Sequence, residues 1–245
     1  MFFFKKNSPI LYDILSDTYV DFHSHLLPNI DDGATSIENT IEIILKLQQF
    51  GFKEFITTPH VMSQVWENSK IEIEQKHQIT KEHIAQWDNT LSFRTAAEYM
   101  LDDNFSRLYK EERLLTLKDN YVLVEMSYLN PPLALYEIIF ELQVAGYKPI
   151  LAHPERYSFY QNALENYDKL KRAGCLFQLN LLSSVGYYGV GVAKTADYLL
   201  KNNLIDFVGS DVHHLNHVAG FEKRIVLKNY ESLHSISQNN IFFKS

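Results

Sequence analysis

Cysteine is almost absent from the sequence, with only Cys175 among 245 residues. A single thiol excludes an internal disulfide framework and is typical of proteins of a reducing cytosol. Long apolar runs are also missing, since none reaches the roughly 18 residues that a transmembrane helix needs. The N-terminal MFFFKK lacks the cleavage site of a signal peptide. We therefore expect a cytoplasmic protein that does not insert into a membrane.

Positive charge is in deficit, because 23 basic residues stand against 30 acidic ones and leave a net charge of −7. A nucleic-acid-binding surface needs a basic stripe, so no nucleic-acid partner is expected. The deficit does not exclude phosphate chemistry, since cations bound by carboxylates reverse the local sign of the charge.

Several motifs of phosphate and acyl chemistry are missing as well. The sequence has no Walker-type G-x-x-x-x-G-K-[ST] loop and no G-x-S-x-G serine elbow. A cysteine-dependent phosphatase needs C-x5-R, but Leu181 stands where that arginine would follow Cys175. Because Cys175 begins an apolar run, we predict that it is an inert core residue.

Short β-rich runs alternate with helix-like stretches, and most of these runs end in His, Asp or Glu. Their apolar character is typical of buried parallel strands. The predicted strands are Tyr19–His23, Glu54–His60, Leu91–Glu98, Tyr121–Glu125, Lys148–His153, Cys175–Asn180 and Ile205–Asp211. This pattern predicts an α/β fold, a distorted (βα)7 TIM-like barrel, with a doubly wound open sheet as the alternative. Residues 19–245 are expected to form a single domain preceded by a loosely held arm, residues 1–18.

Helix signals lie between these strands. Thr35 and Glu38 have the spacing of a capping box. An apolar stripe at helical spacing follows, at Ile37, Ile41, Ile44 and Leu45. Glycines that could end helices stand at positions 51, 146 and 174. Further helices are predicted over Lys70–Trp87, Ala134–Ala145 and Tyr167–Ala173, and a mobile active-site loop is predicted over residues 186–194.

Nine candidate metal ligands fall at or just beyond the carboxyl ends of the predicted strands. They are His23, His25, Asp32, His60, Glu98, Glu125, His153, Asp211 and His213. The carboxyl ends of parallel barrel strands meet at one face, so these side chains are expected around one opening. His23 and His25 are two residues apart on a strand and therefore point to the same side.

Each candidate also has an ordinary interpretation. Asp32 could belong to a polar turn with Asp31, and His60 could cap a helix. Glu125 is costlier to explain in this way, because a lone carboxylate in the apolar VLVEMS would need a buried partner. Taken together, nine such residues on one rim exceed what a single ion can bind. Mixed imidazole and carboxylate ligation suits Zn, Fe or Mn, and we expect a cluster of two or three ions with a bridging carboxylate.

Metal-dependent amidohydrolases also begin with H-x-H on a first barrel strand, but they commonly use a modified lysine as the bridging ligand. Here Glu98 and Glu125 occupy the corresponding strand ends, with no lysine, which weakens that alternative.

The motifs DFHSHLLPNIDDG, TTPH, AAE, VEMS, AHPER and SDVH occur in an order and spacing that resemble the PHP (polymerase and histidinol phosphatase) superfamily. Within it the sequence is most similar to the CpsB/CapC-type tyrosine-protein phosphatases of bacterial capsule and exopolysaccharide systems. The similarity covers roughly residues 19–217. It implies a (βα)7 barrel with three divalent metal ions, often manganese, with iron or zinc as alternatives.

The resemblance also implies how the ligands are shared. The first ion would take His23, His25, Glu98 and Asp211; the second would take Glu98 as a bridge with Glu125 and His153; the third would take Asp32, His60 and His213. Arg156 matches the phosphate-contacting arginine of the family, and its planar fork suits a phosphoryl oxygen. Relatives often carry a second arginine after SDxH, but HLNHVAGF stands there. His217 could replace that contact, the phosphate could be held differently, or the preferred substrate could have changed.

The activity expected from this resemblance is hydrolysis of a phosphomonoester by metal-bound hydroxide, without a phosphoenzyme. Arg156, Asp211 and His213 are the candidate catalytic residues, and the proton donor is left open among His213, His217 and metal-bound water. The expected substrate is a phosphotyrosine-bearing protein, a membrane tyrosine autokinase met at the inner membrane face. The alternatives are a small-molecule phosphatase, acting on histidinol phosphate or nucleotides, and a non-catalytic metal-binding scaffold. The oligomeric state is left open.

Overall fold

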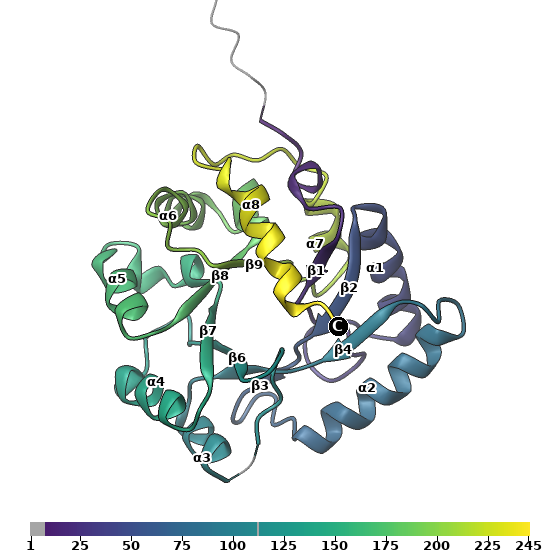
Figure 1. Ribbon diagram of the computed structural model, residues 1–245, viewed down its shortest axis with the longest axis horizontal. Helices are drawn as coiled ribbons and strands as arrows, with labels where there is room; N and C mark the ends of the chain where they lie inside the picture. Colours follow the sequence, from purple (N-terminus) through teal and green to yellow (C-terminus); the bar gives the residue numbers. More distant parts are fainter. Residues whose placement is uncertain (1–7, 112) are drawn as a thin grey trace, which may run out of the picture.

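Parallel β-strands alternate with α-helices along most of the chain, and the helices lie around the outside of the strands (Figure 1). The computed structural model describes residues 8–111 and 113–245. The strands are β1 (Tyr19–Asp21), β2 (Phe52–Thr57), β3 (His60–Val61), β4 (Ser92–Thr95), β5 (Glu98–Met100), β6 (Tyr121–Glu125), β7 (Lys148–Ala152), β8 (Leu176–Asn180) and β9 (Phe207–Gly209). The α-helices are α1 (Ile37–Gln49), α2 (Lys70–Ala85), α3 (Asp103–Glu111), α4 (Leu135–Val144), α5 (Glu165–Arg172), α6 (Val190–Lys201), α7 (Leu215–Gly220) and α8 (Ser232–Asn239).

Short 3-10 helices occupy several connections. They are η1 (Tyr12–Ile14), η2 (Pro154–Arg156), η3 (Ser158–Tyr160), η4 (Leu181–Val185) and η5 (Asn240–Phe243).

The strands form two parallel sheets, with the orders β1-β2-β4 and β3-β5-β6-β7-β8-β9. Two of the predicted strands are each split by a two-residue break, so that β2 is followed by β3 and β4 by β5. The pairing nevertheless continues across the breaks, since Thr57 pairs with Thr95 and His60 pairs with Glu98. The prediction of an α/β fold with parallel strands is confirmed.

The described strands do not pair into one continuous barrel, because β9 and β1 form no ladder with each other. Beyond their carboxyl ends, Asp211 donates its N–H to the His23 carbonyl at 2.8 Å, and His25 donates to the Val212 carbonyl at 2.9 Å. Below that point the buried side chain of Asn240 joins the two strands. Its Nδ2 donates to the carbonyls of Val20 and Val208, and its Oδ1 accepts from the Val208 N–H. The Asp21 carboxylate also accepts from the N–H and the hydroxyl of Ser210, and the Tyr19 hydroxyl donates to the Val208 carbonyl. The two sheet edges are therefore held together by loop backbone and by several buried polar side chains.

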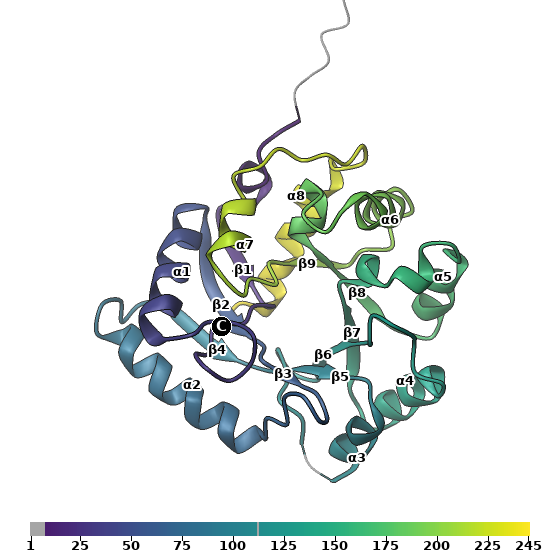
Figure 2. The same ribbon diagram turned by 180° about the vertical axis from the view of Figure 1, so that it is seen from behind.

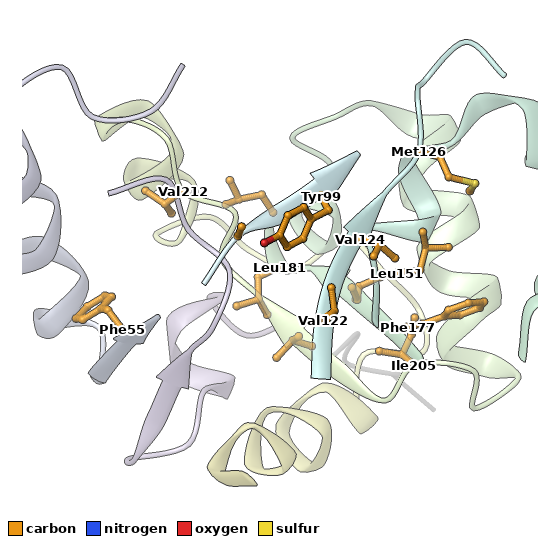
Figure 3. Packing of buried hydrophobic residues seen from close by; sticks show 14 of the residues in the cluster. Phe55, Tyr99, Val122, Val124, Met126, Leu151, Phe177, Leu181, Ile205 and Val212 are labelled. Carbon is orange, nitrogen blue, oxygen red and sulfur yellow. The ribbon is translucent and has the colours of Figure 1, made fainter. Parts of the chain in front are cut away.

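Two apolar clusters lie on opposite sides of the strands, because side chains alternate along a strand. On β6, Val122 and Val124 belong to the larger cluster, which also takes in residues of the surrounding helices, and Leu123 belongs to the smaller one. Figure 3 shows Val122, Val124 and Leu151 gathered on one side of their strands. Phe243 joins the smaller cluster and packs against Phe22. Glu125 shares the face of Leu123 and so points to the inside of the strand assembly at its carboxyl end.

Helix α1 begins one residue later than the capping box predicted. Ser36, not Thr35, is the N-cap, and its side chain accepts from the Asn39 N–H. Of the predicted stripe only Ile44 is confirmed: the buried face of α1 consists of Thr40, Ile43, Ile44 and Leu47, and Leu45 is exposed. The three predicted glycine terminators are confirmed, since positions 51, 146 and 174 all have φ between 91° and 96°, which glycine adopts without strain.

Two further expectations concern less regular segments. Residues 186–194 are not a loop throughout, because α6 begins at Val190 with Gly189 as its N-cap. Residues 1–7 of the predicted arm lie outside the described residues. The part that follows packs on the body of the protein, where Leu11, Ile14 and Leu15 are buried. No helix in the described part of the chain is long and apolar enough to span a membrane.

Candidate metal centre and catalytic cavity

The nine predicted ligand residues meet at the carboxyl ends of the strands, although 190 positions separate the first from the last. His60 and Glu98 begin the short strands β3 and β5, which lie just beyond the carboxyl ends of β2 and β4. Glu125 is the last residue of β6. The others follow β1, β7 and β9 directly or stand in the turn after β1. Helix α7 follows this group and lies in front in Figure 2, whereas α8 lies in front in Figure 1 on the opposite end of the strands.

Glu98 is at the centre of the cluster. Its Oε2 lies 3.2 Å from Nε2 of His23, 3.4 Å from Nε2 of His25 and 3.2 Å from Nδ1 of His60. Its other oxygen lies 3.1 Å from Nε2 of His153. Asp211 reaches the same two histidines of the H-x-H motif, with Oδ1 3.4 Å from both Nε2 atoms.

A second group of donors stands closer to solvent. Oδ1 of Asp32 lies 3.6 Å from Nε2 of His60 and 3.4 Å from Nε2 of His213. The Asp32 side chain is half exposed, whereas Glu98 is fully buried. His60 joins the two groups, because its Nδ1 also lies 2.8 Å from Oε1 of Glu125.

Many of these donor atoms are buried without a hydrogen bond. Five atoms share this property: Nε2 of His23, Nε2 of His25, Nδ1 of His60, Oε2 of Glu98 and Oε1 of Glu125. Burying a polar atom without a partner is costly, and native proteins rarely do so without a reason. Imidazole nitrogens and carboxylate oxygens that converge in this way fit divalent transition-metal ions.

Residues that sequence analysis did not identify orient these ligands from behind. Asp31 Oδ2 lies 2.8 Å from Nδ1 of His25, and Gln178 Oε1 lies 2.8 Å from Nδ1 of His23. Asn180 donates to Oδ2 of Asp211 at 2.7 Å. Partners of this kind fix the ring tautomer and direction of a metal-binding histidine. Asp31 stands in the DDG motif beside the predicted ligand Asp32, and that position is the one signal in the sequence that could have identified it.

The charges within the cluster shift the pKa values of its side chains. Burial favours the neutral ring of His25, but the Asp31 carboxylate outweighs it and raises the pKa of His25 well above its usual value. Burial opposes ionisation of Asp32, yet the hydrogen bond and charge of His213 lower the pKa of Asp32 to about 2. The Asp32 carboxylate is therefore ionised, as a ligand to a cation must be.

Arg156, in η2, stands at the edge of the cluster. Its guanidinium donates to Oδ2 of Asp211 at 2.7 Å. It lies between two aromatic rings, 4.9 Å from the ring centroid of Tyr128 and 4.2 Å from that of Tyr188. Cation–π contacts on both sides hold the planar group in place. A positioned guanidinium beside the donor cluster suits a phosphoryl group.

A cavity of about 780 Å³ opens above the cluster. Arg156 with Tyr128 and Tyr188 forms one part of its lining, and Trp66, Met62 and Met100 form another. The Trp66 ring stacks on His60 with centroids 4.8 Å apart. The cavity therefore combines ionic groups with aromatic and apolar surface, as a site for an aromatic phosphate ester would.

The segment after SDVH contributes a histidine to this cavity. His217 lines it, and its Nδ1 accepts from the His213 N–H at 3.2 Å. Burial, helped by the charges of His214 and His213, lowers the pKa of His217 to about 3. Lys223 lies over the Tyr187 ring, and Arg224 donates to the Ser8 carbonyl. Among the residues that the structure describes, Arg156 is the only arginine or lysine that lines the cavity.

Cys175 lies apart from this site. It belongs to the main apolar cluster and is 2% exposed. Burial raises the pKa of its thiol to about 12. The sequence-based prediction of an inert core cysteine agrees with this environment.

Comparison with known proteins places the chain among relatives of similar length. CapC of Staphylococcus aureus is 27% identical over 226 residues, which cover 90% of this chain and 89% of CapC. The tyrosine-protein phosphatase YwqE of Bacillus subtilis is 27% identical over 197 residues, which cover 80% of this chain and 78% of YwqE. A solved structure from work on YwqE and on CpsB of Streptococcus pneumoniae, described as unique metal-dependent tyrosine phosphatases, superposes with a TM-score of 0.76 at 24% identity. It covers 91% of this chain and 85% of that one.

The match to a family is equally extensive. Residues 19–223 match the family described as "Capsular polysaccharide synthesis, CpsB/CapC". This range holds all nine predicted ligand residues and Arg156, so the resemblance noted in the motifs extends over the whole site. The chain belongs to the CpsB/CapC family.

Proposed function

We propose that this protein is a metal-dependent phosphatase that hydrolyses phosphotyrosine in proteins. The observation that carries the proposal is the convergence of nine imidazole and carboxylate side chains, several with buried donor atoms that make no hydrogen bond, beneath a cavity that holds Arg156. Metal-dependent tyrosine-protein phosphatases among the relatives support the same reaction.

We further propose that the cluster holds three divalent ions, with manganese as the first choice and iron or zinc as alternatives. Compact donor groups support parts of the expected ligand sets: His23, His25 and Asp211 form one, and Asp32, His60 and His213 stand together with His25 in another. Glu125 groups with His60 and Glu98, whereas His153 groups with His23 and Glu98. Glu98 is common to these last two groups, which supports its role as the bridging ligand.

Ions held in this way would activate water and neutralise phosphoryl oxygens. The protein's own residues would position the phosphoryl group of the substrate. Arg156 would hold an equatorial phosphoryl oxygen with its fork, while its remaining contact to Asp211 keeps it aligned with the cluster. His213, which lines the cavity, is our first candidate for delivering a proton to the leaving oxygen. His217 also lines the cavity, but its lowered pKa keeps its ring neutral, so it is better suited to accept a hydrogen bond than to donate a proton. A tyrosine leaving group, with a pKa of about 10, needs little such help.

The natural substrate that we propose is a tyrosine autokinase of the membrane, met by this protein at the cytoplasmic membrane face. Its support is the family's description as capsular polysaccharide synthesis proteins and the tyrosine-protein phosphatase names of relatives. Phosphatases of small molecules such as histidinol phosphate remain the main competing assignment, because the same donor cluster could hydrolyse any phosphomonoester.

Two variants and a metal analysis test the reaction itself. The double variant H23A/H25A should lose both bound metal and hydrolysis of a chromogenic aryl phosphate. Cys175→Ser is the matched control and should keep both. An active double variant together with an inactive Cys175→Ser would overturn the metal-dependent mechanism.

A substrate panel tests the specificity. We expect a phosphotyrosyl peptide to be hydrolysed with a higher kcat/KM than histidinol phosphate or nucleoside monophosphates under the same metal loading. A preference for histidinol phosphate would move the assignment to the small-molecule class and leave the metal chemistry intact.

A further inference from the structure

Glu155, the residue before Arg156, is a buried carboxylate to which the proposed reaction gives no task. It lies in η2, and its side chain is fully buried. Its Oε1 accepts from the Asn180 N–H at 3.0 Å and from the Ser183 hydroxyl at 2.7 Å. Its Oε2 is buried and makes no hydrogen bond to any described residue. Because burial of a carboxylate is costly, its presence here indicates a specific task.

The Glu155 side chain joins η2 to the junction of β8 and η4, where Asn180 is the last residue of the strand. The Asn180 amide is fixed in direction, since its Oδ1 accepts from the Leu182 N–H at 2.8 Å. Its Nδ2 donates to Oδ2 of Asp211 at 2.7 Å and to the Tyr188 hydroxyl at 3.1 Å. Glu155 therefore holds the backbone of the residue whose side chain contacts both Asp211 and Tyr188.

These two contacts of Asn180 are also the contacts that hold Arg156. The guanidinium of Arg156 donates to Oδ2 of Asp211, the same oxygen that Asn180 reaches. It lies 4.2 Å from the ring centroid of Tyr188, the ring whose hydroxyl accepts from Asn180. One carboxylate thus links the turn that carries the arginine to the residue that places the arginine's partners.

The turn that carries Glu155 and Arg156 begins in a strained conformation. His153 has a φ of 34°, in the left-handed region that residues other than glycine rarely adopt. Such strain persists only where the surrounding structure fixes it. The Tyr167 hydroxyl donates to the Pro154 carbonyl at 3.0 Å, and Glu155 anchors the next position. The direction of Arg156 therefore depends on bonds to neighbouring elements.

We propose that Glu155 is a positioning residue for Arg156, a role that rests on the proposed phosphatase reaction. Its two hydrogen bonds fix η2 relative to the junction of β8 and η4. Without them, the guanidinium and its partners Asp211 and Tyr188 can shift relative to one another. Glu155 does not touch the substrate, but a misplacement of about 1 Å in a group that does can cost about 100-fold in rate.

Three variants test this role by their kcat/KM for a small aryl phosphate at saturating metal. Glu155→Ala should lose about tenfold, as the loss of an outer partner typically does. Glu155→Gln should stay close to the wild type, because its amide oxygen can accept both bonds. Glu54→Ala is the matched control and should keep full activity. Glu54 is also buried and accepts from a backbone N–H and a serine hydroxyl, both of Ser245, but it lies near the amino end of β2, away from the cluster.

A double-mutant cycle separates positioning from general structural support. In the Arg156→Ala background, Glu155→Ala should cost less than about twofold, because the group that it positions is gone. Equal losses in the two backgrounds would overturn the proposal, and so would a Glu155→Gln variant as slow as Glu155→Ala. Loss of bound metal in Glu155→Ala would show that Glu155 acts on the metal cluster and would also overturn it.

Arginine labelling of the metal-free protein tests the same role without turnover. Phenylglyoxal should modify Arg156 at least several-fold faster in Glu155→Ala than in the wild type or Glu155→Gln. Arg107, which is 56% exposed on α3, is the internal standard and should react equally in all three. Unchanged labelling of Arg156 overturns the proposal. If the wild type hydrolyses no phosphomonoester but the labelling differs as expected, the proposed function fails and the positioning of Arg156 by Glu155 stands.

Discussion

Oδ2 of Asp31 lies 2.8 Å from Nδ1 of His25, and the same oxygen accepts the backbone N–H of His60 at 3.1 Å. One carboxylate thus fixes the direction of one histidine and the backbone position of another. With Nδ1 held by Asp31, the remaining Nε2 of His25 faces Glu98 and Asp211.

Asp31→Asn should weaken metal binding without unfolding the protein. The amide keeps the shape of Asp31 but removes the negative charge that supports the basicity of His25. Loss of such an outer partner typically costs 10–100-fold in metal affinity. Competition with a chelator would measure the change. Asp17→Asn, in an exposed turn, is the control and should bind metal like the wild type. Equal affinities for the two variants would contradict the role given to Asp31.

Asp31 illustrates which residues of the site could be predicted from the sequence and which could not. The ligands could be predicted because polar residues such as Glu125 and His153 end strongly apolar strands, where burial would be costly without a function. Their orienting partners had no comparable signal. Gln178 lies within β8, and nothing in its neighbourhood indicates which histidine it faces, because that depends on how the strands stand side by side.

The features of the fold that could not be predicted from the sequence have a similar origin. Strand positions could be predicted to within a few residues, since apolar β-branched runs are local signals. The contact between β1 and β9 could not, because it depends on side-chain bonds between residues about 190 positions apart, such as Asp21 to Ser210, and on Asn240 near the end of the chain. The cap of α1 moved from Thr35 to Ser36 because both residue types can cap and backbone geometry decides between them.

Arg156→Ala should reduce kcat/KM for an aryl phosphate by about 100-fold, the usual cost of removing one donor to a transition-state oxyanion. Bound metal should remain at the wild-type level, because Arg156 touches the cluster only through Asp211. Arg156→Lys should restore little activity, since an ammonium group cannot reproduce the planar fork between Tyr128 and Tyr188. Metal content by elemental analysis and steady-state kinetics would measure both effects. Loss of metal in Arg156→Ala would instead show a structural role.

The thiol of Cys175 should resist alkylation in the folded protein. Burial raises its pKa to about 12, against about 8.5 for a free cysteine. Only the thiolate reacts, so at pH 8 about one folded molecule in 10⁴ would carry the reactive form, and the rate should rise about tenfold per pH unit towards pH 12. Iodoacetamide labelling followed by mass spectrometry would measure it. Rapid labelling at pH 8 should appear only after denaturation; rapid labelling of the folded protein would show that Cys175 is accessible and ionised.

Asn240→Ala should destabilise the fold more than any cap or surface change nearby. The side chain is fully buried, and its removal leaves the Val20 carbonyl and the Val208 N–H without their side-chain partner, while the Val208 carbonyl keeps only the Tyr19 hydroxyl. Leaving a buried polar group unsatisfied costs about 1–3 kcal/mol, and we expect a total of about 3 kcal/mol. For a chain of this size, that corresponds to a fall in Tm of about 6–12 °C.

Asn239→Ala is the matched control for this loss. The neighbouring amide is exposed and makes one bond, to the Asp206 carbonyl, so its removal should change the unfolding free energy by less than about 0.5 kcal/mol. Denaturant unfolding of the metal-free protein would compare the two without a contribution from bound ions. If Asn240→Ala were as stable as Asn239→Ala, then the loop contacts and the bonds of Tyr19 and Asp21 to Val208 and Ser210 would be enough to hold β1 and β9 together. The Asn240 side chain would then add nothing to the closure of the strands.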